Sequence, residues 1–155
     1  MGQLRLPQQV QYFASIIFGK ESDLLGAKQQ LTSVIGDISE ETAVMPFSKT
    51  NYYEKEMGGN LLRIFVLFEP LMQREMLPGI KLKTNDIEAS SSKDKRRVVN
   101  IDPGYISLEN IILATTKGYA HRIYIGSGIY GDLTLMYNTG SFRPLMWTYP
   151  DYRSE

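Results

Sequence analysis

Seven polar and aromatic residues in the C-terminal half of the sequence have side chains suited to a ligand site. They are Asn100, Asp102, Tyr105, Lys117, Arg122, Trp147 and Tyr149. Aromatic rings with lysine or arginine nearby are what base stacking and phosphate pairing require. The structural alternative is that tryptophan and tyrosine cover the edge of a core while their N–H or O–H group reaches water. Both interpretations stay open, and Asn51, Tyr52 and Tyr53 are candidates for the same site.

His121 and Asp102 are the candidates for general acid or base catalysis. His121 is the only histidine, and as a base it needs an orienting carboxylate such as Asp102 or Asp151. Lys117 and Arg122 would then stabilise negative charge on a substrate. The alternative is a structural, hydrogen-bonded histidine.

The residue composition argues against metal and thiol chemistry. The chain has no cysteine, which excludes disulfides, iron–sulfur clusters, cysteine-bound zinc and thiol nucleophiles. A single histidine cannot form a histidine cluster, and the carboxylates do not follow the spacing of a known calcium loop. We therefore expect no metal and no cofactor.

Two further motifs have a structural and a functional interpretation. Gly126–Gly131 matches G-x-G-x-x-G, but a strand follows it where a dinucleotide site needs a helix. It predicts a hairpin turn with positive φ, and a phosphate-contacting hairpin is the alternative. Lys93, Lys95 and Arg96-Arg97 form a short basic run. Such a run is typical of a solvated loop, with an RNA or phosphate contact as the alternative.

Overall charge and length limit the class of protein. There are 17 Lys+Arg and 17 Asp+Glu, so no global charge attracts nucleic acid. The 155 residues suit one domain over 1–155, with a core at about 10–137 and an aromatic tail at 138–155. No apolar run approaches the roughly 18 residues of a membrane span, and no secretory signal is recognisable. We expect a cytoplasmic protein.

Hydrophobic periodicity predicts an alternation of strands and helices. The N-terminal half predicts, in order, a strand at Val10–Phe18, a helix capped by Ser22 and ending at Gly36, a weaker strand at Thr42–Phe47, a loop with one helical turn at Asn51–Gly59, and a strand at Asn60–Glu69. Pro78 suits the first turn of a second helix. The alternating segment Ile80–Thr84 leaves a strand as the alternative there.

The C-terminal half predicts more irregular structure. Its expected elements are a loop at Ala89–Lys95, a strand at Arg96–Ile101, a turn at Asp102–Gly104, a helix capped by Ser107 over Leu108–Leu113, a hairpin of Ala120–Ile125 with Ile129–Tyr137, and a tail from Phe142. We therefore predict an α+β fold with a ferredoxin-like βαββαβ core and an antiparallel sheet. A C-terminal helix, a β-hairpin and an irregular aromatic tail extend that core.

Several short segments also resemble a known family. They are Thr50–Gly58, Lys81–Asn85, Val99–Tyr105, Ala114–Lys117, His121–Tyr124 and Trp147–Tyr152. In combination, over about Tyr12 to Arg153, the chain resembles the prokaryotic domain of unknown function 4416 family. The resemblance implies kinship and no established activity, although some members carry a GTP-binding label.

The residues do not support GTP hydrolysis. A P-loop needs G-x-x-x-x-G-K-[ST], so that backbone amides surround phosphate and the hydroxyl holds Mg²⁺. Here Glu21 follows Gly19-Lys20, and Ala14 stands where the first glycine belongs.

Two functions follow from the sequence, and whether the protein is an enzyme stays open. The first is binding of a phosphorylated or nucleotide-like small ligand at the seven-residue cluster and His121. The alternative is a non-catalytic module that binds RNA or protein, or forms a homo-oligomer, through a tyrosine-rich face.

Overall fold

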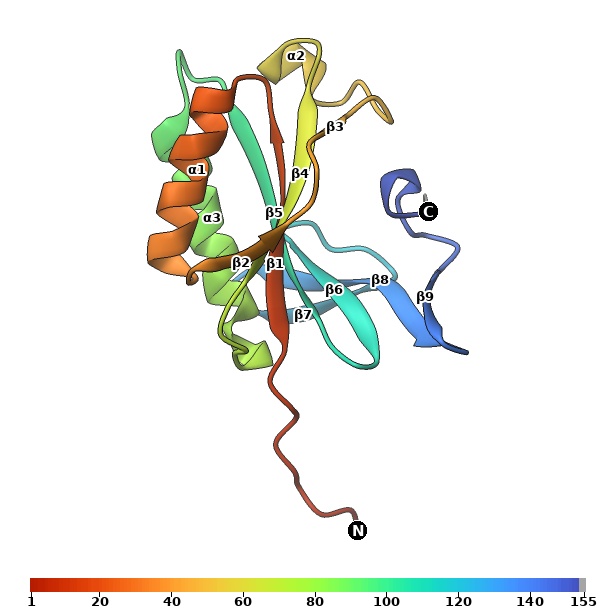
Figure 1. Cartoon of the computed structure of the whole chain (residues 1–155). Helices are drawn as coiled ribbons and strands as arrows, with labels where there is room; N and C mark the ends of the chain where they lie inside the picture. The colour runs from red at the N-terminus through yellow and green to blue at the C-terminus, as the bar shows by residue number, and fades with distance from the viewer. Residues whose placement is uncertain (154–155) are drawn as a thin grey trace.

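The computed structural model describes residues 1–153 (Figure 1). Its strands are β1 Gln11–Phe18, β2 Ile38–Glu41, β3 Met45–Pro46, β4 Leu62–Phe68, β5 Val99–Ile106, β6 Asn110–Thr115, β7 Arg122–Gly126, β8 Ile129–Asn138 and β9 Ser141–Pro144. Its helices are α1 Glu21–Val34, α2 Glu54–Met57 and α3 Leu77–Ser91, with short 3-10 helices η1 Arg74–Met76 and η2 Pro150–Tyr152.

The nine strands form one sheet in which neighbouring strands are antiparallel. The main order is β2-β4-β1-β5-β6-β8-β7, with β3 paired to β4 and β9 paired to β8. β1 is central: Ser15 lies opposite Phe65 on β4 and Asp102 on β5. The predicted mixture of helices with an antiparallel sheet is therefore confirmed.

The core lies between the sheet and the two long helices. Both α1 and α3 cover the same face of the sheet (Figure 1). Because side chains alternate along a strand, β1 directs Tyr12, Ala14, Ile16 and Phe18 to this face, and all four are buried. α1 contributes Leu24, Ala27 and Leu31, and α3 contributes Leu77, Ile80 and Ile87. Complete burial of a large apolar side chain stabilises by about 1.5–3 kcal/mol.

Several predicted elements are confirmed with small shifts of their ends. They are the strand at Val10–Phe18, the helix from about Ser22, the helical turn in Asn51–Gly59, the strand at Asn60–Glu69, the helix that contains Pro78, and the hairpin around Gly126–Gly128. The residue that precedes α1 is Lys20, so the predicted cap at Ser22 is wrong. The strand at Thr42–Phe47 is reduced to the two residues of β3.

The predicted C-terminal helix at Leu108–Leu113 is wrong, because this segment belongs to β6. The hydroxyl of Ser107 accepts hydrogen bonds from the amides of Glu109 (3.1 Å) and Asn110 (3.0 Å). The amide of Ser107 donates to the Asn110 carbonyl at 2.9 Å. Serine therefore closes a tight hairpin between β5 and β6, and the β-branched residues that follow favour a strand.

The predicted turn at Asp102–Gly104 is also wrong, because β5 continues through it. Pro103 is tolerated there since β6 pairs with β5 only from Gly104 onward, and proline needs an edge without a ladder hydrogen bond. A Cβ on Gly104 would lie 2.4 Å from the Ile112 carbonyl oxygen and 2.9 Å from the Phe13 ring. Glycine is thus required by close packing, and no turn is needed.

Two strands lie outside the predicted pattern. β2 is short and polar, and β9 lies within the tail that we expected to be irregular. β9 pairs with the end of β8 from Leu135↔Pro144 to Asn138↔Ser141, so the aromatic tail starts as part of the sheet. Only the neighbouring strand makes these segments extended, which a local pattern does not reveal.

The sheet opens between β5 and β6. The two strands pair only from Gly104↔Leu113 to Ile106↔Ile111, and they then diverge (Figure 1). Val99–Pro103 of β5 therefore has a strand neighbour only on the β1 side. This opening creates space for a site inside an otherwise continuous sheet.

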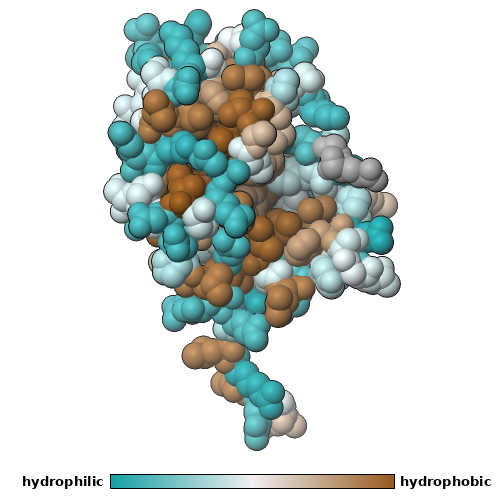
Figure 2. All heavy atoms as spheres, viewed as in Figure 1, coloured by the Kyte–Doolittle hydropathy of each residue, from teal (hydrophilic) through white to brown (hydrophobic). Residues whose placement is uncertain are grey.

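Hydrophobic residues also reach the surface. Figure 2 shows them, in brown, gathered across the middle of the molecule. Within residues 1–153, none of the helices has the length and apolar character needed to cross a membrane.

Candidate functional site

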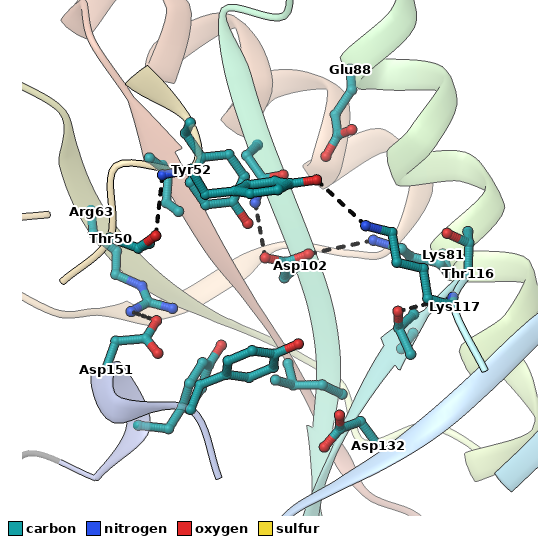
Figure 3. A pocket seen from close by; sticks show the side chains of 18 of the residues that line it. Thr50, Tyr52, Arg63, Lys81, Glu88, Asp102, Thr116, Lys117, Asp132 and Asp151 are labelled. Carbon is teal, nitrogen blue, oxygen red and sulfur yellow. Dashed lines mark hydrogen bonds and ion pairs between the residues drawn. The ribbon is translucent and has the colours of Figure 1, made fainter. Parts of the chain in front are cut away.

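A cavity of about 560 Å³ lies beside the opening between β5 and β6. Small-molecule sites usually have about 300–1,000 Å³, so this cavity has room for a metabolite. Its charged and aromatic lining residues are Phe47, Tyr52, Tyr53, Arg63, Lys81, Glu88, Arg97, Asp102, Lys117, Arg122, Asp132, Tyr149, Asp151 and Tyr152 (Figure 3). They come from the sheet, from α3, from the loops before α2, before β5 and after β6, and from the C-terminal segment.

Side chains of α3 satisfy the exposed edge of β5. The amide of Ile101 donates to Glu88 Oε1 at 2.6 Å, and Lys81 Nζ donates to the Ile101 carbonyl at 3.4 Å. Burial raises the pKa of Glu88, while the Ile101 amide and Lys81 act in the opposite direction. One wall of the cavity is therefore a strand edge held by two buried, oppositely charged side chains instead of by another strand.

Asp102 lies at the centre of this wall, and both of its oxygens have partners. Lys81 Nζ is 3.5 Å from Oδ1, and the Asn100 side-chain amide donates to Oδ2 at 2.8 Å. Asn100 in turn accepts a hydrogen bond from Arg97 at 2.8 Å. The carboxylate is thus held by Lys81 of α3 and Asn100 of β5, and Arg97 in turn holds Asn100.

Arg97 extends this network to the helix α2. Its guanidinium donates to both oxygens of Glu56 at 2.8–3.1 Å, and Nη1 lies 3.5 Å from Glu88 Oε2. Hydrogen bonding from Arg97 is the main cause that lowers the pKa of Glu56. The same contact to Glu56 raises the pKa of Arg97. Arg97 therefore ties α2 to β5 and α3.

The C-terminal segment supplies a partner for the most buried arginine. Arg63 Nη1 lies 2.5 Å from Asp151 Oδ2, and Nε donates to the Ser15 hydroxyl at 2.8 Å. The Arg63 and Asp151 side chains are 5% and 17% exposed. A buried charge needs both a counter-charge and hydrogen bonds. Residues 88 positions apart in the sequence thus depend on each other.

Tyr152 places its ring under the same arginine. The guanidinium carbon of Arg63 is 4.9 Å from the Tyr152 ring centroid and 4.7 Å from the Phe65 ring centroid, and the two rings meet edge to face with their centroids 5.8 Å apart. The Tyr152 hydroxyl is buried and makes no hydrogen bond of standard geometry in the described part of the chain. Burial is the largest cause that raises the pKa of Tyr152, so the hydroxyl stays neutral.

Arg122 and Asp132 form a second ion pair in the lining. Arg122 Nε donates to Asp132 Oδ2 at 2.9 Å, Nη1 donates to the Lys117 carbonyl at 3.1 Å, and Nη2 donates to the Tyr149 hydroxyl at 2.6 Å. Arg122 thereby joins β7, β8, the loop after β6 and the C-terminal segment. Its role in this arrangement is to hold four parts of the wall together.

Lys117 differs from the other four lining cations, because no carboxylate of residues 1–153 pairs with it. Its Nζ is 3.4 Å from the Tyr52 hydroxyl and 5.6 Å from the centre of the Tyr52 ring. Figure 3 shows Lys117 and Tyr52 reaching toward one another across the cavity. A lysine with this surrounding keeps a positive charge available for an anion.

Five of the eight residues predicted for the site line the cavity. They are Asn100, Asp102, Lys117, Arg122 and Tyr149, and the neighbouring Tyr52 and Tyr53 join them. Tyr105 lies outside the lining because alternation along β5 directs it away from Asp102. There its ring packs against Tyr12 at 5.9 Å and beside Arg74.

His121 and Trp147 lie one layer behind the lining. His121 Nε2 is 3.3 Å from Asp132 Oδ2, and its ring stacks on Trp147 at 5.1 Å with an interplanar angle of 17°. Trp147 Nε1 donates to the Leu133 carbonyl at 2.7 Å. The structure places these two rings as supports for Asp132, so Asp102 is the one predicted acid–base residue in the lining.

Sequence reasoning missed five charged residues of the site. They are Arg63, Lys81, Glu88, Arg97 and Asp132. An arginine inside the otherwise apolar segment Leu61–Phe68 is a signal, because a charge in a buried strand requires a partner. Lys81 and Glu88, seven residues apart, share one face of a helix. Only the opening beside β5 turns that face into a cavity wall.

The remaining motifs have structural roles. Gly126, Ser127 and Gly128 all have positive φ, which confirms the hairpin interpretation. In the basic run, Arg97 points into the protein, and Lys93 pairs with Asp23 at 3.0 Å. Across residues 1–153, no group of three or more metal-ligating side chains is close enough to hold a metal ion.

Comparison with known proteins gives one result. The family described as Domain of unknown function (DUF4416) matches residues 8–155, nearly the whole chain. No curated protein and no solved structure matches the sequence or the fold.

Proposed function

The chain belongs to the domain of unknown function 4416 family, and from this starting point we propose that it binds a small phosphorylated or nucleotide-like ligand in the cavity beside β5. The observation that carries the proposal is that Lys117 has no carboxylate partner within residues 1–153. The other four lining cations, Arg63, Lys81, Arg97 and Arg122, each contact a carboxylate.

A positively charged side chain without a carboxylate partner in a cavity wall favours binding of an anionic ligand. The Lys117 ammonium group can donate up to three hydrogen bonds, and within residues 1–153 it donates one, to the Tyr52 hydroxyl. Thr50, Thr115 and Thr116 add hydroxyl groups to the same lining. Phosphate oxygens accept hydrogen bonds from both ammonium and hydroxyl groups, and charge-assisted bonds are about twice as strong as neutral ones.

Aromatic rings at the mouth suit the remainder of such a ligand. Tyr52 is 64% exposed and Tyr149 is 48% exposed, although both line the cavity. Stacking of a base on an aromatic side chain contributes about 1–3 kcal/mol. A ring joined to a phosphate would use the tyrosines and Lys117 together.

The proposal is binding, with no reaction assigned. Asp102 is engaged by Lys81 and Asn100, and Asp132 is engaged by Arg122 and faces His121. A general base needs an oxygen available to the substrate proton. These carboxylates are better explained as the groups that keep the cavity cations in position.

A thermal-shift screen tests this function directly. Nucleoside mono-, di- and triphosphates, sugar phosphates and inorganic phosphate are added to the whole protein. A ligand at about 100 times its Kd stabilises by about 2.7 kcal/mol. For a chain of this size that raises Tm by roughly 2–4 °C per kcal/mol. If none of these compounds raises Tm, the proposal is wrong.

A second candidate function is self-association or protein binding through β7. This strand ends the main strand order of the sheet, and Ile123 and Tyr124 are 73% and 59% exposed. An edge strand with apolar side chains is suited to pair with another strand. Native mass spectrometry of the protein and of Ile123→Lys tests it: the variant should lose any oligomer, and a monomeric wild type would refute self-association.

We also propose that β1, α1, β2, β4, α3 and β5 form a ferredoxin-like unit. The order β2-β4-β1-β5, with antiparallel neighbours and both helices on one face, supports it. In this proposal β6 to β9 are an extension beyond the fourth strand of the unit. An experimental structure that places α1 and α3 on opposite faces would contradict it.

A further inference from the structure

A second hollow lies on the face of the sheet that the helices do not cover. It has a volume of about 190 Å³ and is lined by Phe13, Phe65, Leu67, Ile106, Ile111 and Tyr152. Phe13 lies opposite Leu67, and Ile106 lies opposite Ile111, so four neighbouring strands build this groove. Apart from the tyrosine hydroxyl, its side chains are apolar.

The apolar groove and the polar cavity share one lining residue. Tyr152 lines both, and its ring contacts both Phe65 of the groove and the guanidinium of Arg63 in the cavity. Ile17 lines the cavity and Phe13 lines the groove. They are four residues apart on β1, which is about 13 Å along a strand.

Charge and polarity change sharply along this path. At one end the lining carries five cations, of which Lys117 lacks a carboxylate partner in residues 1–153. At the other end the side chains that line the groove offer only hydrocarbon and aromatic surface. Figure 2 shows hydrophobic residues at the surface across the middle of the molecule. A ligand that satisfied both ends would itself have a charged and an apolar part.

We propose that the ligand is an amphiphile, with an anionic head group in the cavity and a short apolar chain in the groove. This rests on the proposed function and names its ligand class. At roughly 30 Å³ per group, the volume of one water in the liquid, the groove holds about six methylene groups. The chain would pass Tyr152, whose side chain forms the boundary between the two hollows.

A series of alkyl phosphates tests the inference. Binding of inorganic phosphate and of butyl, hexyl, octyl and dodecyl phosphate is measured by isothermal titration calorimetry with the whole protein, below micelle-forming concentrations. Each methylene buried should increase affinity by about twofold to fourfold. We expect the gain to continue to about six or eight carbons and then to level off.

Substitutions in the groove test whether the alkyl chain of the ligand binds there. Ile111→Asn places an amide in the groove, and it should remove the dependence on chain length while leaving the affinity for inorganic phosphate unchanged. Leu25→Asn, at a residue of α1 that is 53% exposed, is the control and should bind like the wild type. Ile111→Ala, a milder change, should reduce the gain per methylene if the asparagine variant does not fold.

The outcomes separate this inference from the proposed function. If phosphate and all alkyl phosphates bind equally, the amphiphile proposal is wrong and anion binding stands. If the affinity still depends on alkyl-chain length in the folded Ile111 variants, the alkyl chain binds elsewhere and the proposal is wrong. If neither these compounds nor nucleotides bind, the proposed function itself fails.

Discussion

The two faces of β1 bury side chains by different means, although residues of both faces alternate along one strand. Toward the helices, Tyr12, Ala14, Ile16 and Phe18 are at most 2% exposed and pack in a continuous apolar core. Toward the cavity, Ser15 is equally buried but accepts a hydrogen bond from Arg63. The helix-covered face packs apolar side chains almost throughout, and the other face combines buried Phe13 and Ile17 with the hydrogen-bonded pair Ser15 and Arg63.

This difference separates stability from the proposed function. Apolar packing stabilises in proportion to the area removed from water, whereas a buried ion pair contributes little net stability and is costly to break. The helix-covered face therefore carries the fold. The cavity face keeps charged groups in fixed positions at the surface of that fold, where a ligand can reach them.

The largest expected effect is on the helix-covered face. Ile16→Ala should lower the free energy of unfolding by about 2–5 kcal/mol, because it leaves a cavity among buried side chains. Urea denaturation measures the change. Leu108→Ala, at a residue 74% exposed, is the control and should change stability by less than about 0.5 kcal/mol. Equal losses of stability in the two variants would contradict the claim that the helix-covered face carries the fold.

The cavity face should respond to the loss of a partner charge. Asp151→Asn keeps the shape but leaves Arg63 without its counter-charge, which should cost about 1–3 kcal/mol of stability. Asp86→Asn on α3, an exposed carboxylate, is the matched control. A wild-type denaturation curve for the Asp151 variant would mean that the C-terminal segment does not hold Arg63.

The pH dependence of stability should have opposite signs at Glu88 and Glu56. Burial raises the pKa of Glu88, so the folded protein takes up that proton first as pH falls toward about 4.3, the unfolded value. The wild type should therefore gain stability relative to Glu88→Gln as pH falls.

Glu56 provides the contrast. Arg97 lowers the pKa of Glu56, so its stabilisation is present above the unfolded pKa and is lost as pH falls through the folded pKa. The wild type should lose stability relative to Glu56→Gln over that range. Urea denaturation between pH 3 and 8, in steps of about one unit, compares the two variants, and slopes of the same sign would contradict this assignment.

A smaller effect is expected where the cavity wall meets solvent. Tyr149→Phe removes the hydroxyl that accepts from the charged Arg122 guanidinium at 2.6 Å, and a hydrogen bond to a charged group contributes about 1.5–3 kcal/mol. Because the site is exposed, we expect the lower end. Tyr137→Phe, at a similarly exposed tyrosine, is the control and should have no effect on thermal unfolding. If it changes Tm as much as Tyr149→Phe does, the hydrogen bond between Tyr149 and Arg122 does not contribute to stability.

Local pattern predicted those parts of the fold in which periodicity and burial agree. The apolar run Val10–Phe18 and the three-to-four spacing of Leu24, Ala27 and Leu31 were sufficient for a strand and a helix. The pattern of the segment after Ser107 was not sufficient to distinguish a helix from a strand, because the hydroxyl of serine suits a helix cap and a tight hairpin equally. β9 depends on β8 for its hydrogen bonds, so its own residues do not predict it.

The candidate site was predictable only in part. Lys117 follows β6 and Arg122 begins β7, whereas Asn100 and Asp102 lie inside β5 and not at the turn that was expected there. The alternation that places Asp102 in the cavity necessarily directs Tyr105 elsewhere, and the uninterrupted course of β5 decides this. Arg63 and Asp151 meet across 88 residues, and no local spacing predicts such a contact.

The central claim is that Lys117 offers a positive charge to an anionic ligand. Its most direct test is calorimetric titration of wild type, Lys117→Ala and Lys83→Ala with the phosphorylated compound that gives the largest thermal shift. Lys83 is an exposed lysine of α3 and lies outside the cavity lining. Loss of a hydrogen bond to a charged group, about 1.5–3 kcal/mol, weakens binding by about tenfold to a hundredfold. We predict that loss for Lys117→Ala alone, and wild-type affinity in that variant would contradict the account.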